Sequence, residues 1–464
     1  MRQLVHVISD LHLGGAPATA STPGFQMCPP ATHCLLRDFI DRLPPSTSKL
    51  ESHLVIAGDI VDFLAEAPFE AFTTDPNLAC QKLQRIFDST AVVWDALKCF
   101  ANERSGILTL MLGNHDIELA LPTVRDMLHR RVQGPHVRFI YDNEAFTLGP
   151  LLIEHGNRFD AWNAVPHGAL RRVRSQQSRH ADVTPAFASP PGSRMVIDVL
   201  NPLKRQYPFV DLLKPETASA LPVAAALGAL GLQDAWNAYK QFRSKQTVDF
   251  DEESGEPVSQ GYIAAAANPD QELWIAAQAI ARGGDGQQIS AATDLLAKGA
   301  SVITESVRAA RIDALYTAFR KLAVMRRLHI QAFDVTVEVD TYLKPARRAA
   351  AAKFKVIVYG HTHLPKLVPL QDAVYLNTGT WADMMCVPDG IWDDDEMSGR
   401  IAFRAFAEDL GASSLGKWRR SLPTYARVAI DEVGRAAASL HFAVDDTHVT
   451  TNSLMQRLQG RVVS

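Results

Sequence analysis

The sequence predicts an α/β protein that carries a large helical insertion. Five short apolar segments each end in a cluster of polar residues, and helical patterns separate several of them. An alanine-rich stretch over residues 160–350 is mostly helical in pattern and lacks such polar clusters. Strands that alternate with helices indicate a sheet whose functional site lies at the carboxyl ends of its strands.

The strand-like segments lie on both sides of the alanine-rich stretch. They cover the ranges 3–9, 53–57, 107–112, 151–153 and 355–359. Aliphatic residues dominate each range, as expected of buried strands. Helical patterns cover roughly residues 33–43 and 80–103. Two further runs, 426–431 and 438–444, flank a Glu-Val-Gly-Arg turn and predict a hairpin that could complete a second sheet.

Length and composition indicate a globular protein. The 464 residues are enough for a large buried core without disulfides or a structural metal. Hydrophobic residues make up 47% and charged residues 21%, which argues against a disordered chain or a fibrous repeat. The formal net charge of -4 provides no global basic excess with which to hold nucleic acid.

The cysteines and the apolar runs of the sequence indicate the cellular compartment of the protein. The five cysteines are odd in number and scattered, with no Cys-x-x-Cys pair, so a disulfide framework is not expected. The amino-terminal residues lack the apolar core of a signal peptide, and no apolar run is long enough to span a bilayer. We expect a soluble, cytoplasmic protein, and peripheral membrane contact stays open.

Side chains that commonly bind metals follow the last apolar residue of each strand-like segment. In chain order they are Asp10, His12, Asp59, Asp62, Asn114, His115, His155, His361 and His363. One such cluster alone is as often a turn, but random turns would not place such ligands repeatedly at strand ends. Carboxylate, amide and imidazole ligands without thiolate favour Mn²⁺, Fe²⁺ or Zn²⁺. The set is large enough for two divalent metal ions, and Asp59, after a glycine turn, suits a bridging position between them.

Five blocks of this sequence resemble the calcineurin-like metallophosphoesterases. They are Asp-Leu-His at 10–12, Gly-Asp-Ile-Val-Asp at 58–62, Gly-Asn-His-Asp at 113–116, His-Gly at 155–156 and Gly-His-Thr-His at 360–363. The resemblance covers roughly residues 1–160 and 350–385. It implies a four-layer αββα sandwich of two mixed sheets. The catalytic domain would then be discontinuous, over 1–159 and 351–464, with a helical cap or insertion over 160–350.

The same resemblance implies a set of roles. One metal would take Asp10, His12, Asp59 and His363, and the other would take Asp59, Asn114, His155 and His361. A metal-bridging hydroxide would attack a phosphate ester or pyrophosphate bond, and His115 would act as the general acid. Asp62 matches the carboxylate that orients this histidine, since a neighbouring carboxylate keeps an imidazole protonated. A helix or turn cap is the alternative for Asp62, and Asp116 is expected to cap the segment after it.

Other residues near these blocks have two interpretations each. Arg158 could bind a phosphate oxygen of the substrate or form a surface salt bridge. Four arginines of the insertion could favour a polyanion or form a solvated basic helix face; they are Arg171, Arg172, Arg174 and Arg179. Asn377, in the turn after a further strand-like run, is expected to be architectural.

The sequence leaves more than one substrate and more than one reaction class open. The blocks around Asp10 and Asp59 also look like the UDP-diacylglucosamine pyrophosphohydrolases, although those enzymes generally have Arg where this chain has His115. We expect a small phosphorylated substrate, such as a nucleotide, a sugar phosphate or a lipid pyrophosphate. The alternatives are a catalytically silent metal-binding scaffold and a phosphodiesterase or nuclease acting on nucleic acid. The net charge and the lack of interleaved aromatic and basic residues weigh against nuclease action.

Overall fold

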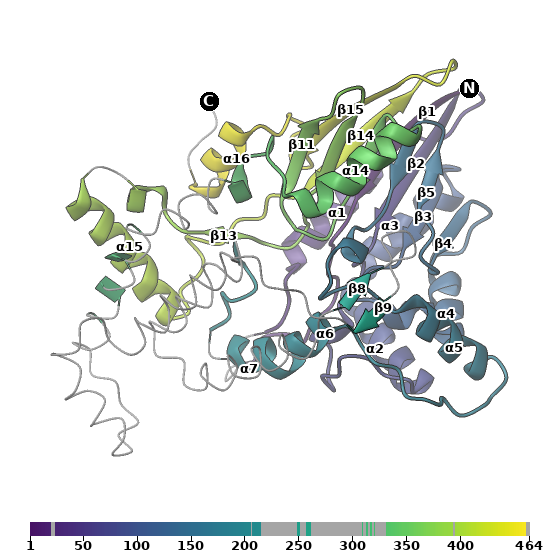
Figure 1. The fold of residues 1–464 in the computed structure, drawn as a ribbon, viewed down its shortest axis with the longest axis horizontal. Coiled ribbons are helices and arrows are strands. Elements are labelled where there is room, and N and C mark those ends of the chain that lie inside the picture. The colour runs from purple at the N-terminus through teal and green to yellow at the C-terminus, as the bar shows by residue number, and fades with distance from the viewer. Residues whose placement is uncertain are drawn as a thin grey trace.

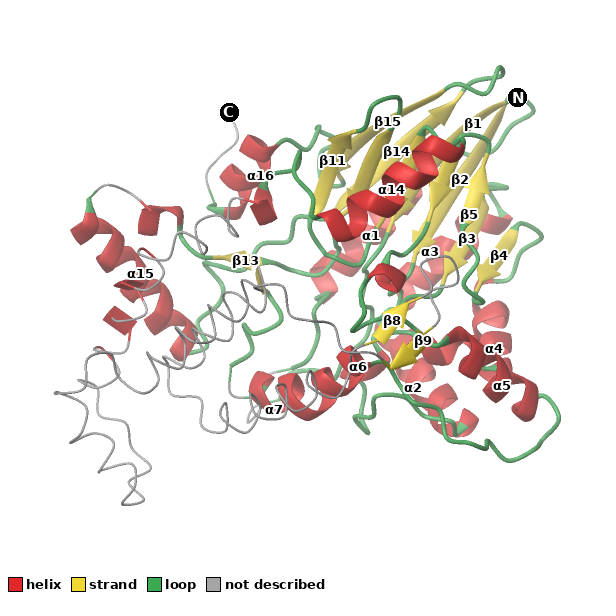
Figure 2. Ribbon diagram, viewed as in Figure 1, coloured by secondary structure: helices red, strands yellow, loops and turns green. Residues whose placement is uncertain are grey.

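The structure is a computed structural model built around two mixed β-sheets with surrounding helices (Figure 1, Figure 2). It describes residues 1–19, 24–205, 207–214, 248–250, 257–260, 331–392 and 395–460, with a few isolated residues between 309 and 320. Most of the range 215–330 therefore lies outside the described residues. The prediction of a mainly helical cap over 160–350 stays a prediction.

The first sheet has six strands in the order β15-β14-β1-β2-β3-β4. Their bounds are β1 (Arg2–Ile8), β2 (Leu50–Ala57), β3 (Ile107–Met111), β4 (Val137–Ile140), β14 (Thr424–Ile430) and β15 (Ala436–Phe442). Strands β1 to β4 run parallel, whereas β14 is antiparallel to β1 and β15 is antiparallel to β14. The predicted hairpin thus extends the first sheet, and its assignment to a second sheet is wrong. The free edge of β1 accepts it, with Val5 opposite Val428.

The second sheet has five strands in the order β11-β12-β10-β6-β5. Their bounds are β5 (Phe146–Leu148), β6 (Leu151–Ile153), β10 (Val356–Tyr359), β11 (Pro365–Pro369) and β12 (Val374–Thr378). The three inner strands β12, β10 and β6 are parallel, and the two outer strands are antiparallel to their neighbours. Strand β6 comes before the range 160–350 and β10 after it, so segments that are far apart in the sequence share this sheet.

Both faces of the first sheet are buried. Successive residues of β2 show this, because Leu54 packs with Trp94 and other helix residues, whereas Val55 packs with Ile153 of the second sheet. The helices on the first face are α1 (Pro30–Arg42), α2 (Pro76–Ser89), α3 (Ala91–Asn102) and α4 (Pro122–Val132). The expected helix over 80–103 is divided at Thr90, whose N–H ends α2 by bonding to the Ile86 carbonyl.

Helix α14 (Asp340–Ala352) packs against the second sheet. Its buried residues Tyr342 and Ala346 contact the cluster that contains Ile357 and Tyr375. Near the carboxyl end of the chain lie β13 (Met385–Cys386), η6 (Asp389–Trp392), α15 (Glu396–Gly411) and α16 (Thr451–Leu458).

Several short elements follow β6 along the chain. They are η3 (Asn157–Phe159), α5 (His167–Gln177), α6 (Pro191–Met195), η4 (Val196–Leu200), α7 (Asn201–Lys204) and the strands β7 (Leu213–Lys214), β8 (Val248–Phe250) and β9 (Pro257–Gln260). Leu170 and Val173 of α5 are buried in clusters with residues of the amino-terminal arm. Strand β7 pairs in parallel with β13.

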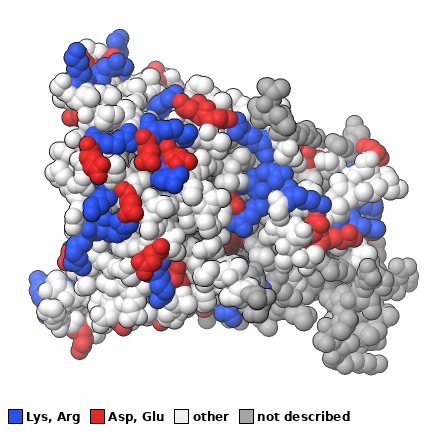
Figure 3. Space-filling model, turned by 180° about the vertical axis from the view of Figure 1, so that it is seen from behind, with Lys and Arg blue, Asp and Glu red and all other residues white. Residues whose placement is uncertain are grey.

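The described surface is mixed in charge. Figure 3 shows acidic and basic side chains interspersed over much of one face, with a group of basic side chains beside the residues that are not described. In the part of the chain that the structure describes, no helix combines the length and apolar character needed to cross a membrane.

Candidate metal centre

The predicted ligands lie in loops at the carboxyl ends of strands in both sheets. Loops after β1, β2 and β3 carry one subset, and loops after β6 and β10 carry the rest. Because the strands within each subset are parallel, their loops leave the same edge of the sheet. The two edges are joined directly, since the His361 N–H donates to Asp10 Oδ2 at 2.9 Å.

Five ligand residues have a left-handed backbone, which non-glycine residues seldom adopt. The φ angles are +53° at Asp10, +46° at His12, +49° at Asp59, +71° at His361 and +62° at His363. Sparsely populated conformations cost on the order of 1–3 kcal/mol each and persist where the surrounding structure holds them. The concentration of strain in three loops indicates a functional constraint there.

Glycines beside the ligands allow the loops to approach closely. A Cβ atom on Gly113 would lie 2.1 Å from Asp59 Oδ1. One on Gly58, where φ is +90°, would lie 2.4 Å from the His155 ring. Only glycine fits at either position, so these two motif glycines have a packing role beside the ligands.

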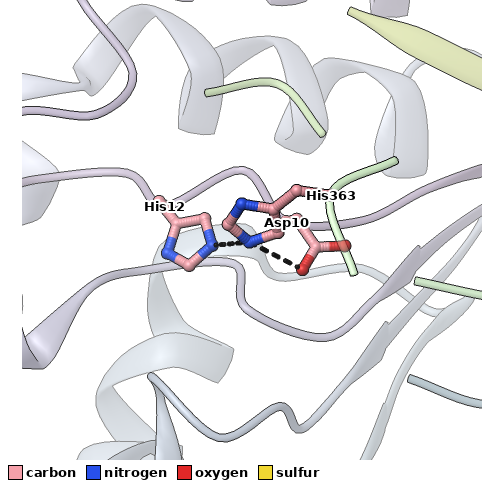
Figure 4. Close-up of side chains that lie close together, drawn as sticks. All are labelled: Asp10, His12 and His363. Carbon is pink, nitrogen blue, oxygen red and sulfur yellow. Dashed lines mark hydrogen bonds and ion pairs between the residues drawn. The ribbon is translucent and has the colours of Figure 1, made fainter. Parts of the chain in front are cut away.

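Asp10, His12 and His363 form the first group of candidate ligands (Figure 4). His363 Nε2 lies 3.4 Å from Asp10 Oδ1 and 3.0 Å from His12 Nε2. Asp10 Oδ1 is buried and makes no hydrogen bond to any described residue. Burial, then the charge of Lys214, lowers the pKa of His363 to about 3, so this ring is neutral. Neutral imidazole is the form that binds metals.

Asp59, His155 and His361 form the second group, with Asn114 beside it. His155 Nε2 lies 3.3 Å from Asp59 Oδ2 and 3.3 Å from Asn114 Oδ1. His155 Nδ1 lies 2.7 Å from the carbonyl of Ala57 and therefore donates its proton there. Burial lowers the pKa of His155, but Asp59 outweighs it and raises the value to about 9. A cation and a proton therefore compete for Nε2 beside this carboxylate.

Asp59 faces both groups. Its Oδ2 lies 3.3 Å from His155 Nε2 and 3.9 Å from His12 Nε2, and the side chain is 1% exposed. Burial raises the pKa of Asp59, but the nearby histidines, His155 first, hold it well below the usual range. A bridging ligand requires one ionised carboxylate that reaches both metal positions.

His115 and Asp62 form a pair next to the first group. His115 Nδ1 donates to Asp62 Oδ1 at 3.2 Å, and the His115 N–H donates to Asp59 Oδ1 at 2.8 Å. Burial lowers the pKa of His115, but Asp62 and then Asp59 raise it to about 9. Asp62 also caps η1 (Phe63–Ala65), because Oδ1 accepts the N–H groups of Leu64 and Ala65. Asp62 therefore caps η1 and also contacts His115, and its role in orienting a general acid stays a prediction.

Asp160 interacts with His361 in a way that sequence patterns alone do not indicate. Its Oδ2 lies 3.1 Å from His361 Nε2 and accepts a hydrogen bond from Asn163 at 2.7 Å. Burial raises the pKa of Asp160, but the hydrogen bond with His361 more than offsets this. A carboxylate on one ring nitrogen fixes which nitrogen can face a metal. The available signal was only its place in the turn that follows His155.

Asp116 does not cap the segment that follows it. Its side chain makes no capping bond to η2 (Ile117–Ala120). It instead accepts the N–H groups of Ile60 and Gly113, each at 2.7 Å. The predicted cap is wrong because the Asp116 carboxylate accepts these two buried N–H groups instead. One comes from the loop after β2 and the other from the loop after β3.

The arginines that flank the centre form ion pairs. Arg158 pairs with Glu154 at 2.7 Å, which is the salt-bridge interpretation, and its binding of substrate stays a prediction. Arg171 and Arg174 both pair with Asp142, at 2.8 and 2.9 Å. Asn377, expected to be architectural, donates to the carbonyl of Gly360 at 2.6 Å and so supports the loop that carries His361.

These His and Asp groups could bind metal ions. Ligand atoms in each group lie within 4.8 Å of one another, and a third group of this spacing contains His12, Asp62 and His115. The donors are imidazole, carboxylate and amide oxygen, which suit divalent transition metals. Asp10 Oδ1 is a further sign of fit, since it is buried with no hydrogen bond to a described residue and only the His363 ring nearby, at 3.4 Å.

Comparison with known proteins gives little further guidance. No family model matches the chain, and no curated protein matches it. A Staphylococcus aureus protein assigned as a 5'-nucleotidase, solved with alpha-ketoglutarate, is 14% identical with a TM-score of 0.31 over 99% of this chain. The chain spans 58% of that protein. The phosphopantetheinyl hydrolase of Mycobacterium tuberculosis is 11% identical with a TM-score of 0.24, over 82% of this chain and 90% of its own. At these TM-scores neither similarity supports an assignment.

Proposed function

We propose that the chain is a metal-dependent hydrolase that cleaves a phosphate ester or pyrophosphate bond. The observation that carries this proposal is the position of Asp59, whose Oδ2 lies within 4 Å of a histidine of each candidate group. A shared carboxylate between two nitrogen-rich groups is the arrangement of two-metal phosphoester hydrolases. The five sequence blocks that resemble calcineurin-like metallophosphoesterases support the same proposal.

The residues that would hold two divalent metal ions are those grouped by the geometry. Asp10, His12, Asp59 and His363 would hold one ion, and Asp59, Asn114, His155 and His361 would hold the other. Bound there, Mn²⁺, Fe²⁺ or Zn²⁺ would supply Lewis acidity toward phosphoryl oxygens and lower the pKa of water. Asp160 would position His361, and Asp116 would hold the β2 and β3 loops in register.

His115 is the proposed proton donor. A pKa raised to about 9 keeps the ring protonated near neutral pH. Nδ1–H is held by Asp62, so the proton on Nε2 is the one that can pass to the leaving oxygen. Asp62 would act through His115 and is therefore a positioning residue. General acids of this kind contribute roughly 10²–10⁴-fold to rate.

The packing of the described elements supports the finer fold assignment within this proposal. Helices cover one face of the first sheet, the two sheets pack face to face, and α14 packs on the second sheet. We therefore propose the four-layer αββα sandwich, with a catalytic domain over 1–159 and 351–464. Residues 160–350 would select the substrate, because the insertion starts and ends beside strands that carry proposed ligands.

The test is hydrolysis of aryl phosphate monoesters and diesters by the full chain loaded with Mn²⁺. Asp59→Asn should abolish turnover and reduce the metal content measured by mass spectrometry. Asp126→Asn, on the exposed side of α4, is the matched control and should change neither. Unchanged turnover in Asp59→Asn would exclude the proposal. Bound metal without turnover across phosphoesters and nucleic acids would favour the silent scaffold, and cleavage of DNA or RNA alone would favour the nuclease.

A further inference from the structure

Ser9 directly precedes Asp10 and lies where the loops of the two sheets meet. Its side chain is buried, with 0% of the residue exposed. A Cβ atom on Gly360, in the loop after β10, would lie 2.6 Å from Ser9 Cβ and 2.7 Å from Asp10 Oδ2. The glycine therefore lets this loop of the second sheet come directly against Ser9 and Asp10 of the first sheet.

Two hydrogen bonds occupy one oxygen of the Asp10 carboxylate. Ser9 Oγ donates to Asp10 Oδ2, and the His361 N–H donates to the same oxygen at 2.9 Å. A carboxylate oxygen has two lone-pair positions, so both positions of Oδ2 are taken. The other oxygen, Oδ1, is buried, makes no hydrogen bond to a described residue and lies 3.4 Å from His363 Nε2. One oxygen of Asp10 therefore remains for a cation.

The direction of the hydrogen bonds at Ser9 follows from its surroundings. A hydroxyl group has one proton to donate, and an ionised carboxylate only accepts, so the Ser9 proton points to Asp10. Thr378 Oγ1 lies 2.5 Å from Ser9 Oγ and therefore donates to it. The Gly379 carbonyl, 3.5 Å from Ser9 Oγ, is the weaker acceptor for the Ser9 proton. The hydrogen bonds thus run in one direction, from Thr378 through Ser9 to Asp10.

Thr378 is itself fixed between the two sheets. It is the last residue of β12, and its carbonyl accepts a hydrogen bond from Thr424 Oγ1, at the start of β14, at 2.5 Å. Both threonines are buried. Buried strands leave these hydroxyl groups little freedom to turn, so the Ser9 hydroxyl holds the Asp10 carboxylate in one orientation.

We propose that Ser9 is a positioning residue that makes Asp10 a one-oxygen ligand and thereby favours divalent transition-metal ions over Ca²⁺. Ca²⁺ takes roughly 6–8 oxygen ligands and often binds both oxygens of a carboxylate. Mn²⁺, Fe²⁺ and Zn²⁺ accept imidazole nitrogen beside a single carboxylate oxygen. With both lone pairs of Oδ2 taken, Asp10 has no second oxygen to give. This inference rests on the metal-binding part of the proposed function and does not depend on which bond is cleaved.

The experiment measures the dissociation constants of Mn²⁺ and Ca²⁺ for the full chain by competition with a chelating dye. Ser9→Ala removes the hydroxyl and should weaken binding of the Mn²⁺ ion at Asp10 roughly tenfold, because the carboxylate is no longer held. The same change opens Oδ2, so Ca²⁺ should bind as in the wild type or more tightly. The Kd for Ca²⁺ divided by the Kd for Mn²⁺ should therefore fall roughly tenfold or more.

Two further variants complete the experiment. Thr378→Val removes the hydroxyl that donates to Ser9 and should lower the same ratio by a smaller factor. Ser52→Ala is the matched control, at a buried serine of β2 whose hydroxyl makes no hydrogen bond to a described residue. It should leave both constants at their wild-type values. Circular dichroism melting checks that each variant folds.

The ratio separates positioning from a general loss of structure. Equal weakening of both ions in Ser9→Ala, or no change in either, overturns the proposal. If Ser9→Ala does not fold, Thr378→Val decides, and an unchanged ratio there overturns it as well. A wild-type chain that binds neither ion rejects the metal centre and this proposal with it. The expected fall in the ratio, in a wild-type chain that cleaves no phosphoester, supports the role of Ser9 and rejects the hydrolase.

Discussion

The pair of His115 and Asp62 provides the sharpest prediction. Asp62→Asn removes the negative charge that lies 3.2 Å from His115 Nδ1 but keeps a side chain of the same size. An amide oxygen can still accept from Nδ1–H, so the ring should keep its position. The variant therefore isolates the effect of the charge on the protonation of His115.

The size of the effect follows from the raised pKa. The shift of His115 from 6.5 to about 9 corresponds to about 3.4 kcal/mol in favour of the protonated ring. Burial opposes that shift, while Asp62 supplies the larger of two carboxylate contributions and a hydrogen bond as well. Without that charge, we expect the pKa of His115 to fall by more than about 1 unit. Proton donation by the variant should then fail at lower pH than in the wild type.

The assay is an NMR titration of the histidine ring resonances between pH 5.5 and 10 in chelator-treated protein. His115→Gln assigns the resonance, and Asp126→Asn serves as the control for an aspartate far from the ring. A His115 pKa that stays within about 0.5 unit of the wild-type value in Asp62→Asn would refute the electrostatic account. In metal-loaded protein, the alkaline limb of the pH–rate profile should move to lower pH in the same variant.

Three further predictions concern other residues. Asp160→Asn should weaken metal binding roughly 10–100-fold, because it releases the His361 ring. A competition titration with a chelating dye measures this affinity, and an unchanged affinity would contradict the positioning role of Asp160. Gly113→Ala places a Cβ atom 2.1 Å from Asp59 Oδ1, so metal retained through gel filtration should drop, whereas full retention would show that the loop can adjust. Burial lowers the pKa of His6 to about 4, so the unfolded chain binds the extra proton between pH 6.5 and 4 and stability falls as the pH falls. His6→Phe should remove up to about 3 kcal/mol of that acid loss in urea unfolding, and an identical acid loss in both proteins would contradict this.

The sequence predicts that the candidate ligands lie close together because each follows a strand. Parallel strands bring their carboxyl ends to the same edge of a sheet. Asp10 and Asp59 therefore had to lie near each other. The spacing of apolar residues does not reveal which sheet edge a hairpin joins, and for that reason the runs 426–431 and 438–444 were expected in the wrong sheet. Pairing with β1 is a long-range property of the folded chain.

Two carboxylates show the same limit at the level of single residues. A turn position after a strand is typical of a cap, which is why Asp116 was assigned as one. Its actual partners, Ile60 and Gly113, come from two different loops. Asp160 meets a histidine 201 positions further along the chain, and no local pattern encodes that contact.

The candidate ligands are divided between the two sheets, and this division has a thermodynamic consequence. Asp10, His12 and Asp59 follow strands of one sheet, and His155 and His361 follow strands of the other. A cation bound by residues of both sets crosslinks the two sheets. Its binding increases the free energy of unfolding by about 4 kcal/mol when the free metal concentration is a thousand times Kd. The melting temperature would then rise with metal concentration. Removing the metal would weaken the packing between the two sheets before any secondary structure is lost.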